Sequence, residues 1–418
     1  MPRNLYRVAL AVAAAAALLA AGARPAPAAA CWPMRQEGAD WLVETPNYFV
    51  KTDLGPDVAQ TVATHQEVLY AELYRRMGKI RALRMRDRFT VHVYQQESRY
   101  LGELGAIGGS RGIFMPSKDV LACWGAPRQL DLILQTLRHE GTHQFVAHFI
   151  GQGCPVWLNE GLAVFYEHGR FQRGRLEIGQ VAAGRVALLR QAIAKGTLIP
   201  LAHVLGMSNA EWVDNVSSGR PEGYLQYCQA WSMVHFLAYG SGKKYQPAFL
   251  AYMKLVSQGR RSIDAWERTF GANLQGFEAC WKDYVQGLRP SVEPACRAHL
   301  EVLGWLLTRA DPQHTADLAT FRQAVVEGRL GEWRMRLSSG FEISSTDKKT
   351  LASLFRCPDD RGKDGAPSYE LVPGRDGEPH VVRCRHHKGK VLQTAYEKDA
   401  KTGAWSVRVV AGPAAGSR

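Results

Sequence analysis

The sequence predicts an α+β fold, in which most strand patterns lie in the first and last parts of the chain and most helical patterns in the middle. Segments with strand-like alternation lie between Trp41 and Trp124, helical spacing of apolar side chains then dominates as far as Leu288, and alternation returns after Val381. Runs of strands followed by runs of helices are typical of this class. A chain of 418 residues has room for one large and one smaller domain, and the Pro-containing segment Arg289–Pro294 predicts the boundary between them.

The first predicted elements are a strand–helix–strand unit and a hairpin. The apolar stretch from Trp41 to Thr52 predicts one strand, and the spacing of apolar residues over Val58–Met77 predicts a helix. Phe89–Tyr94 alternates as a strand does. Arg111–Met115 and Val120–Trp124 predict two further strands, joined by a turn-rich connection.

Helical spacing dominates the middle of the chain, and the C-terminal part combines both patterns. Besides a helix around residues 133–149, helical segments are expected at Leu162–Tyr166, Leu176–Ile193, Tyr224–Leu237, Tyr245–Val256, Ser262–Phe270, Leu274–Leu288, Ala298–Thr308 and Thr315–Val326. Three strands in a small antiparallel meander are expected at Val381–Arg385, Val391–Tyr396 and Trp405–Val410.

One helix carries the motif H-E-x-x-H at His139, Glu140 and His143. At about 3.6 residues per turn the two histidines lie one above the other, so two neutral imidazoles can bind one zinc ion. Glu140 projects from the same half of the helix and reaches the open position of the metal without ligating it, where a base takes a proton from water. The alternative is a helix with two surface histidines and a glutamate by chance. The apolar surroundings and a second acidic motif favour the metal site.

Glu160 is the expected third ligand, because a catalytic zinc usually has three protein ligands and one open position. It follows a Gly-Gln-Gly-Cys-Pro turn and lies at the start of a second apolar run. A helix, a turn and a returning helix would bring its carboxylate back to His143, which predicts a His₂Glu site with one Zn²⁺ per chain. His148 and His168 are expected to be structural, since His148 lies on another side of the helix. Gly141 in mid-helix predicts close packing there.

These motifs resemble those of the gluzincin metallopeptidases. Trp157–Ala163 reads W-L-N-E-G-L-A and is similar to the W-L-N-E-G-F-A of the aminopeptidase N family, whose glutamate is the third zinc ligand. The wider frame Tyr48–Leu288 resembles the bacterial peptidase MA-like proteins, a family of predicted secreted zinc peptidases, with matching segments at Arg111–Pro116 and Tyr227–Leu237. The exopeptidase motif G-A-M-E-N is absent from the sequence, so the resemblance does not imply exopeptidase specificity.

The resemblance implies a zincin-like metallopeptidase domain over residues 31–290, with a small mixed sheet over an α-rich lower half, and an accessory domain over residues 291–418. In gluzincins an edge strand of the sheet binds an extended peptide or protein substrate. Gly112–Met115 is the expected edge strand, and an interior strand is the alternative. The resemblance also implies that Tyr227 donates to the oxyanion, although the lysine of the family's Y-x-K-G-A pattern is missing. Tyr224 is the alternative donor, and both tyrosines could instead be core aromatics.

Residues Met1–Ala30 have the features of a secretory signal: a positive start, the apolar run Val8–Ala21 and the cleavage pattern Ala28–Ala30. The run is short and Ala-rich for a membrane span, so we expect an exported chain, periplasmic or secreted, with no transmembrane segment after cleavage. Cys31 directly after the cleavage site would allow a lipoprotein anchor. Ala28 in place of the usual leucine favours simple cleavage.

The formal net charge of the whole chain is +13. The basic residues are spread widely, with no run of five or more like charges. A solvated basic surface is the simplest interpretation, and a weak attraction to anionic envelope polymers is the functional one. No aromatic-interleaved basic motif predicts a nucleic-acid partner.

The sequence contains 8 cysteines, and an even number in an exported chain favours disulfides. No pair has C-x-x-C spacing, so a second zinc site built on thiolates is not indicated. We expect a Cys123–Cys154 bridge, because these residues precede and follow the motif helix in short connections. We also expect a Cys357–Cys384 bridge in the C-terminal part. Cys228 and Cys280 are competing partners for these bridges.

The sequence therefore predicts an exported zinc metallopeptidase that hydrolyses peptide bonds, with Glu140 as the general base. A non-catalytic zinc-containing protein of the cell envelope is one alternative. The intact Glu140 argues against it, because a structural zinc site needs no base. A hydrolase of cell-wall peptides is the other alternative, and the basic charge would suit it.

Overall fold

In the computed structural model the chain divides into two units. One unit contains the chain up to Gln180 together with Leu188–Gly287, and the other contains Val181–Ala187 together with Leu288–Arg418. This division lies next to the boundary segment expected from the sequence, while the roles assigned to the two parts remain predictions. The expected signal, residues 1–30, lies outside the described residues. The structure describes residues 31–81, 88–105, 110–151, 153–172, 174–337, 342–356, 369–375, 377–387, 390–399 and 402–413.

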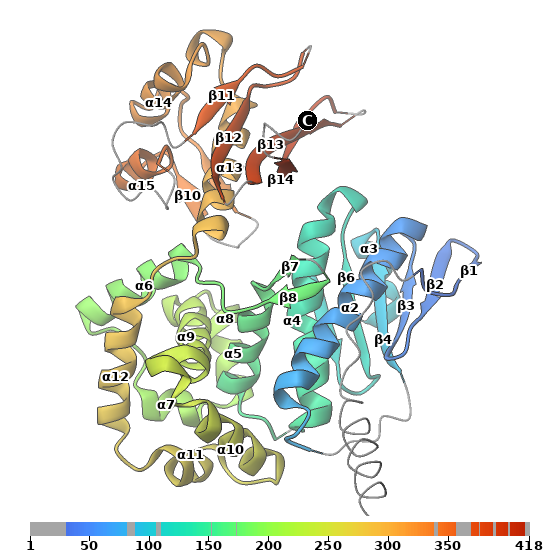
Figure 1. The fold of residues 1–418 in the computed structure, drawn as a ribbon, viewed down its shortest axis with the longest axis vertical. Helices are drawn as coiled ribbons and strands as arrows, with labels where there is room; N and C mark the ends of the chain where they lie inside the picture. Colours follow the sequence, from blue (N-terminus) through green and yellow to red (C-terminus); the bar gives the residue numbers. More distant parts are fainter. Residues whose placement is uncertain are drawn as a thin grey trace, which may run out of the picture. The chain divides into compact units, whose positions relative to one another are not determined.

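A mixed six-stranded sheet forms one side of the first unit (Figure 1), in the order β1-β2-β3-β4-β6-β5. β3, β4 and β6 are parallel to one another, and the other neighbouring pairs are antiparallel. The expected α+β class is confirmed, and so is the edge position of Gly112–Met115. The strands are β1 (Met34–Glu37), β2 (Asp40–Glu44), β3 (Tyr48–Thr52), β4 (Phe89–Tyr94), β5 (Gly112–Met115) and β6 (Val120–Trp124).

The single strand expected from Trp41 to Thr52 is wrong, because this segment forms the two strands β2 and β3. A turn that contains Pro46 separates them, and the N–H of Thr45 donates a hydrogen bond of 2.9 Å to the carbonyl of Tyr48 across it. Proline sets a turn-compatible φ and cannot donate to a ladder, so it interrupts the strand.

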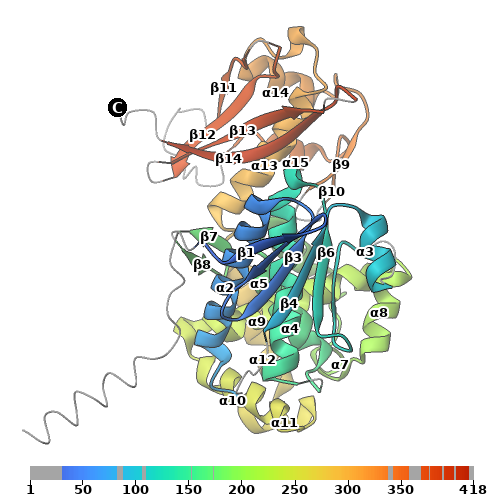
Figure 2. The ribbon, with the colours of Figure 1, turned by 90° about the vertical axis from the view of Figure 1, so that its right-hand side faces the viewer.

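Helices cover both faces of the sheet. α2 (Pro56–Met77) and α4 (Leu130–Phe149) pack on the face that carries Val91, while the short helix α3 (Glu97–Leu104) packs on the opposite face against Tyr94. Figure 2 shows the strands side by side in front of α2 and α4. A 3₁₀ turn at Pro127–Gln129 leads into α4. α2 agrees with the prediction, and α3 was not expected.

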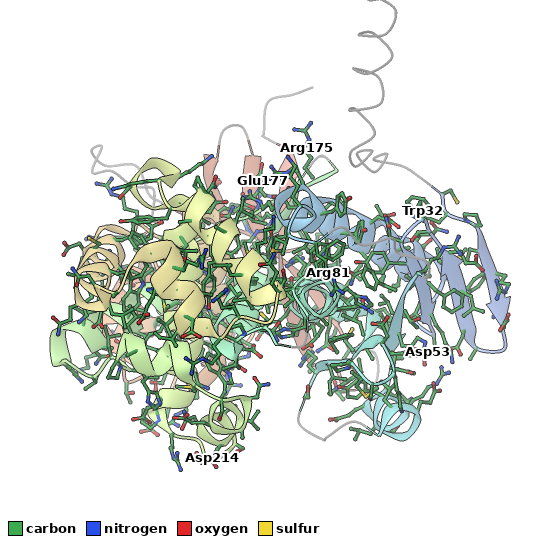
Figure 3. All side chains as sticks on the ribbon, turned by 90° about the horizontal axis from the view of Figure 1, so that it is seen from below. Trp32, Asp53, Arg81, Arg175, Glu177 and Asp214 are labelled. Carbon is green, nitrogen blue, oxygen red and sulfur yellow. The ribbon has the colours of Figure 1, made fainter. Side chains whose placement is uncertain are left out.

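The rest of the first unit is mainly helical, and within the described residues no helix has the length and apolar character that a membrane span requires. Seen from below, Trp32 and Asp53 lie on the sheet side and Asp214 of α8 on the helical side (Figure 3). The elements are α5 (Val156–Glu167), β7 (Arg170–Gln172), β8 (Arg175–Glu177), α6 (Ala183–Lys195), α7 (Leu201–Gly206), α8 (Asn209–Ser217), α9 (Pro221–Lys243), α10 (Gln246–Ser257), α11 (Ser262–Phe270) and α12 (Leu274–Gly287). The first residues of α6, up to Ala187, belong to the second unit.

The helix expected over Leu176–Ile193 is wrong at its start, because Arg175–Glu177 pairs with Arg170–Gln172 as a two-stranded hairpin. Leu176 is buried while its two neighbours are exposed, which is strand alternation over three residues only. α8 was not predicted.

Two glycines allow close packing around the motif helix. A Cβ at Gly141 of α4 would lie 2.9 Å from Leu69 Cδ2 of α2, which confirms the close contact expected there. A Cβ at Gly161 of α5 would lie 2.7 Å from the carbonyl oxygen of Ala230 in α9. α4 and α5 are therefore held tightly by the helices on either side of them.

The second unit has its own core between helices and a four-stranded antiparallel sheet, β11-β12-β13-β14. The expected three-stranded meander is confirmed, and β11 extends it. The elements are α13 (Val292–Leu307), a 3₁₀ turn (Pro312–His314), α14 (Leu318–Val326), β9 (Arg334–Arg336), β10 (Glu342–Ser344), α15 (Lys348–Ser353), β11 (Glu370–Val372), β12 (Val381–His387), β13 (Lys390–Lys398) and β14 (Trp405–Pro413).

The expected Cys123–Cys154 bridge is wrong, since both residues are free thiols. Cys123 precedes α4 and Cys154 follows it, and this helix of 20 residues is about 30 Å long, so the two connections do not return to the same place. Cys357 lies outside the described residues, which leaves the Cys357–Cys384 bridge a prediction. The Sγ atom of Cys384 lies 3.1 Å from the Sγ atom of Cys296.

Candidate metal centre

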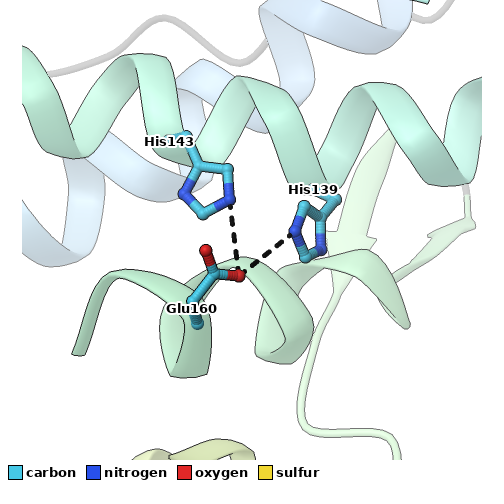
Figure 4. A group of neighbouring side chains, drawn as sticks. All are labelled: His139, His143 and Glu160. Carbon is cyan, nitrogen blue, oxygen red and sulfur yellow. Dashed lines mark ion pairs between the residues drawn. The ribbon is translucent and has the colours of Figure 1, made fainter. Parts of the chain in front are cut away.

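His139, His143 and Glu160 converge between α4 and α5 (Figure 4). One carboxylate oxygen of Glu160, Oε2, lies 3.6 Å from Nε2 of His139 and 3.7 Å from Nε2 of His143. The ligand atoms of the three side chains all lie within 4.8 Å of one another. Across the described ranges of the chain, no other group of three potential metal ligands is found. The structure therefore brings together the three residues that the sequence predicts as ligands.

Regular helix geometry produces this arrangement. His139 and His143 are one helical turn apart on α4, and their ring centroids lie 4.8 Å apart. Pro155 directly precedes α5, which places Glu160 in the second turn of that helix and opposite the two rings. The turn between the helices reverses the chain, so a ligand from α5 reaches ligands on α4.

The Nδ1 atom of each imidazole, on the side of the ring away from Glu160, lies next to a hydrogen-bond acceptor. Nδ1 of His139 lies 3.1 Å from Oε2 of Glu167, and Nδ1 of His143 lies 2.9 Å from Oδ1 of Asn159. Because a carboxylate and an amide oxygen can only accept, both Nδ1 atoms must donate. In the neutral ring the lone pair then lies on Nε2, which is the nitrogen that faces Glu160 in each histidine.

The donor set fits a zinc ion. Oε2 of Glu160 is buried and has no hydrogen-bond partner among the described residues. With both imidazoles neutral, two Nε2 lone pairs face this oxygen, and a cation bound between the three acceptors would satisfy all of them. Two imidazoles and one carboxylate are a common ligand set for a catalytic zinc.

The electrostatics of the group also favour positive charge. Burial lowers the pKa of His139, but the carboxylates of Glu160 and Glu167 raise it more, so the pKa lies well above its ordinary value. Burial raises the pKa of Glu160, but the imidazoles of His143 and His139 outweigh this, and the net pKa is lowered. Charged Glu160 is thus the favoured state despite its burial.

Glu140 lies beside the three-residue group and is not a member of it. Its Oε2 accepts a hydrogen bond of 2.9 Å from the backbone N–H of Phe114 in the edge strand β5. The carboxylate of Glu140 therefore points toward β5, the edge strand of the sheet. A base that is close to a metal group without ligating it is the arrangement expected from the motif.

Tyr227 lies beside Glu160, since both line one pocket between α5, α8 and α9. Burial raises the pKa of Tyr227 well above its usual range, and the negative charges of Glu160 and Glu140 contribute in the same direction. The phenol therefore stays protonated and able to donate. Tyr224, the alternative donor, is 38% exposed and does not line this pocket. The structure thus favours Tyr227 over Tyr224, while its role stays a prediction.

The pocket has a volume of ≈ 340 Å³ and adjoins the metal group through Glu160. Three helices contribute its walls. The lining residues are Val156, Asn159 and Glu160 of α5, Asn209, Trp212, Val213, Val216 and Ser217 of α8, and Tyr227 of α9.

Several residues at the site were not anticipated from the sequence. Glu167 follows Glu160 by two helical turns on the same face of α5, so the 3.6-residue period could have indicated it. Asn159 lies within the W-L-N-E motif. Arg138 stabilises the end of α5, because its Nε donates a hydrogen bond of 2.9 Å to the carbonyl of Glu167. Burial lowers the pKa of Arg138 to about 10. The Phe114 amide and α8 have no sequence signal.

The two other histidines considered as ligands lie outside the group. His148 Nε2 lies 2.9 Å from Oδ1 of Asp119, in the turn between β5 and β6. His168 follows the last residue of α5. The expectation that both are structural agrees with these positions.

Residues 108–287 match the sequence model of the peptidase MA superfamily, a span that contains the metal group and Tyr227. No curated protein matches the chain. The match supports a metallopeptidase in general and confirms the expected relation at the level of the superfamily. The closer motif resemblance to the aminopeptidase N family remains a prediction.

Proposed function

Residues 108–287 match the sequence model of the peptidase MA superfamily, and from this premise we propose that the chain is a zinc-dependent metallopeptidase with Glu140 as its general base. One observation carries the proposal: two imidazoles face a buried carboxylate oxygen that has no hydrogen-bond partner among the described residues, and a second carboxylate, that of Glu140, lies beside them. A structural zinc site needs no such additional carboxylate, which argues against the non-catalytic alternative.

His139, His143 and Glu160 would hold one Zn²⁺. When bound, the ion supplies Lewis acidity, which polarises a carbonyl and makes a water molecule a stronger acid. Glu167 and Asn159 accept from the two Nδ1–H groups and so keep both Nε2 lone pairs directed at the ion's position.

Glu140 takes a proton from the attacking water and passes it to the leaving amine nitrogen. The Phe114 N–H orients the carboxylate for this transfer. Tyr227 donates a hydrogen bond to the oxygen of the former carbonyl, where negative charge develops. β5, as an edge strand, can pair through its main chain with an extended peptide or protein substrate.

We further propose that the protein acts after export, in the periplasm or outside the cell. The signal-like pattern of residues 1–30 supports this location. Its removal takes away three arginines and no acidic residue, and the remaining net charge of +10 would give a weak attraction to anionic envelope polymers.

A peptide digest of matched variants tests the proposal. The wild type should carry one zinc and cleave an equimolar library of acetylated, amidated decapeptides. Glu140→Gln should keep the zinc and lose cleavage, because the base is removed while the ligands stay. His143→Ala should lose the zinc, and Glu177→Gln, on the exposed hairpin, should match the wild type. Cleavage by Glu140→Gln at the wild-type rate would reject the mechanism.

A further inference from the structure

α8 exposes two apolar side chains on one face. Val213 is 62% exposed and Val216 45%, and both lie one turn apart on the same side of the helix. Val213 has the largest exposed fraction among the large apolar side chains that the structure describes. Exposed apolar residues that join into a contiguous patch can mark a binding surface.

Loose packing does not explain this exposure, because α8 is fixed firmly to α9. Trp212 is 2% exposed, and its carbonyl accepts a hydrogen bond of 3.0 Å from the buried side chain of Gln226. The same Gln226 accepts a 3.1 Å bond from Asn215. At Gly223 a Cβ would lie 2.5 Å from the carbonyl oxygen of Asn215, so the two helices are in close contact.

The outer side of α8 has a different character. Asp214 pairs with Arg220 at 3.1 Å, and Figure 3 shows Asp214 pointing outward from the helix. Apart from Ala210, the other exposed positions of α8 are polar or charged, so Val213 and Val216 are its only exposed large apolar side chains.

Both valines line the pocket of ≈ 340 Å³ that contains Glu160. Trp212, Val156 and the ring of Tyr227 complete an apolar wall, and Glu160 is the only charged residue among the described lining side chains. Since Glu160 faces the two imidazoles, the remaining lining offers no charge to a ligand. The volume is at the lower end of ligand pockets, which suits one side chain rather than a whole cofactor.

We propose that this pocket binds one large apolar side chain of the peptide substrate, on a residue next to the scissile bond, and that Val213 and Val216 set this preference. The proposal rests on the proposed function, since it assigns the substrate class of the same site. An apolar side chain in the pocket is removed from water by Trp212, Val216 and Tyr227, whereas a charged one would be desolvated without a counter-ion.

Cleavage mapping tests the preference. The wild type, acting on the randomised decapeptide library, should cut beside Leu, Ile, Val, Phe or Met at one fixed position relative to the cleaved bond. Val216→Glu and Val213→Glu should reduce kcat/KM for those peptides by about tenfold or more and shift selection at that position toward Lys and Arg. Leu250→Glu is the matched control, because Leu250 is 41% exposed on α10 and does not line the pocket. If the wild type, Val216→Glu, Val213→Glu and Leu250→Glu all select the same side chains at that position, the proposal is overturned.

A binding measurement separates this proposal from the catalytic one. Zinc-loaded Glu140→Gln is titrated with Ac-Ala-Phe-Ala-NH₂ and with Ac-Ala-Gln-Ala-NH₂, and complex formation is followed by tryptophan fluorescence and calorimetry. The phenylalanine peptide should bind about tenfold or more tightly, and adding Val216→Glu should remove the difference. Equal affinities would reject the pocket assignment even if hydrolysis is found. If neither the wild type nor any variant cleaves the library, the catalytic proposal fails. Tighter binding of the phenylalanine peptide than of the glutamine peptide would still support the pocket assignment.

Discussion

Glu140 and Phe114 are joined by a hydrogen bond of 2.9 Å, from the backbone N–H of Phe114 to Oε2 of the carboxylate. The contact links the motif helix α4 to the edge strand β5. In an antiparallel pair, backbone groups point alternately toward the partner strand and away from it. The carbonyl of Arg111 accepts a hydrogen bond from the N–H of Trp124 in β6, so the backbone groups of Arg111 point toward β6. Phe114 is an odd number of residues further on, so its N–H points away from β6 and toward Glu140. The orientation of the general base therefore depends on the position of the edge strand.

Gly112→Ala should disturb this relationship. A Cβ at Gly112 would overlap Cγ2 of Thr136 and lie 3.1 Å from Cγ of Glu140, so β5 must move away from α4. We expect a loss of about 1–3 kcal/mol in stability and a fall in turnover of up to about 10²-fold, with zinc content unchanged. Thermal melts, zinc analysis and kinetics check this. Gly102→Ala is the control, because a Cβ at Gly102 meets nothing within 4 Å. Equal behaviour of the two variants would contradict the expectation.

Glu167→Ala should weaken the metal site without removing a ligand. The carboxylate accepts from Nδ1 of His139 at 3.1 Å and from Gln135 at 2.8 Å, and so orients the imidazole. Loss of such an outer partner typically costs 10–100-fold in metal affinity, so we expect the zinc Kd to rise by about that factor. Competition with a chromogenic zinc chelator measures it. Glu177→Ala serves as the control. A zinc Kd like that of the wild type would show that Glu167 does not position His139.

The ligand set was predictable because it depends on local periodicity. Spacing places His139 and His143 on one face of a helix, and a short turn with a returning helix is enough to bring Glu160 back. The edge position of Gly112–Met115 was expected from the family resemblance. The hairpin pattern alone could not distinguish an edge strand from an interior one.

Other parts of the site were not predictable, for physical reasons. The Phe114 donor is a backbone amide, which every residue except proline possesses, so no residue type indicates it. α8 contradicts the usual rule that apolar residues are buried, because Val213 and Val216 are exposed while Asn215 is 8% exposed. The Cys123–Cys154 bridge was inferred from chain order, without allowance for the length of the helix between the two residues.

Removal of the metal should lower stability. Without a cation, the buried Oε2 of Glu160 has no described hydrogen-bond partner and faces two imidazoles. We expect the Tm to fall after treatment with 1,10-phenanthroline and to recover with added Zn²⁺; at about 100 times the Kd, binding contributes about 2.7 kcal/mol. Scanning calorimetry with and without zinc checks this. His139→Ala/His143→Ala should show no response to zinc, and a Tm of the wild type that is independent of zinc would contradict a bound ion.

Tyr227→Phe should reduce turnover while zinc content and fold are retained. The substitution removes only the phenolic hydroxyl, and the ring still packs against Trp212 at a centroid distance of 5.0 Å. Loss of one oxyanion donor typically costs about 10²–10³ in kcat, so we expect a fall of that size with little change in KM. Steady-state kinetics on a peptide identified from the library, together with zinc analysis and a thermal melt, measure it. Tyr224→Phe is the matched control on the same helix, since Tyr224 is 38% exposed and outside the pocket. If Tyr224→Phe loses turnover and Tyr227→Phe does not, the donor is Tyr224. If neither variant loses turnover, both tyrosines only support the structure.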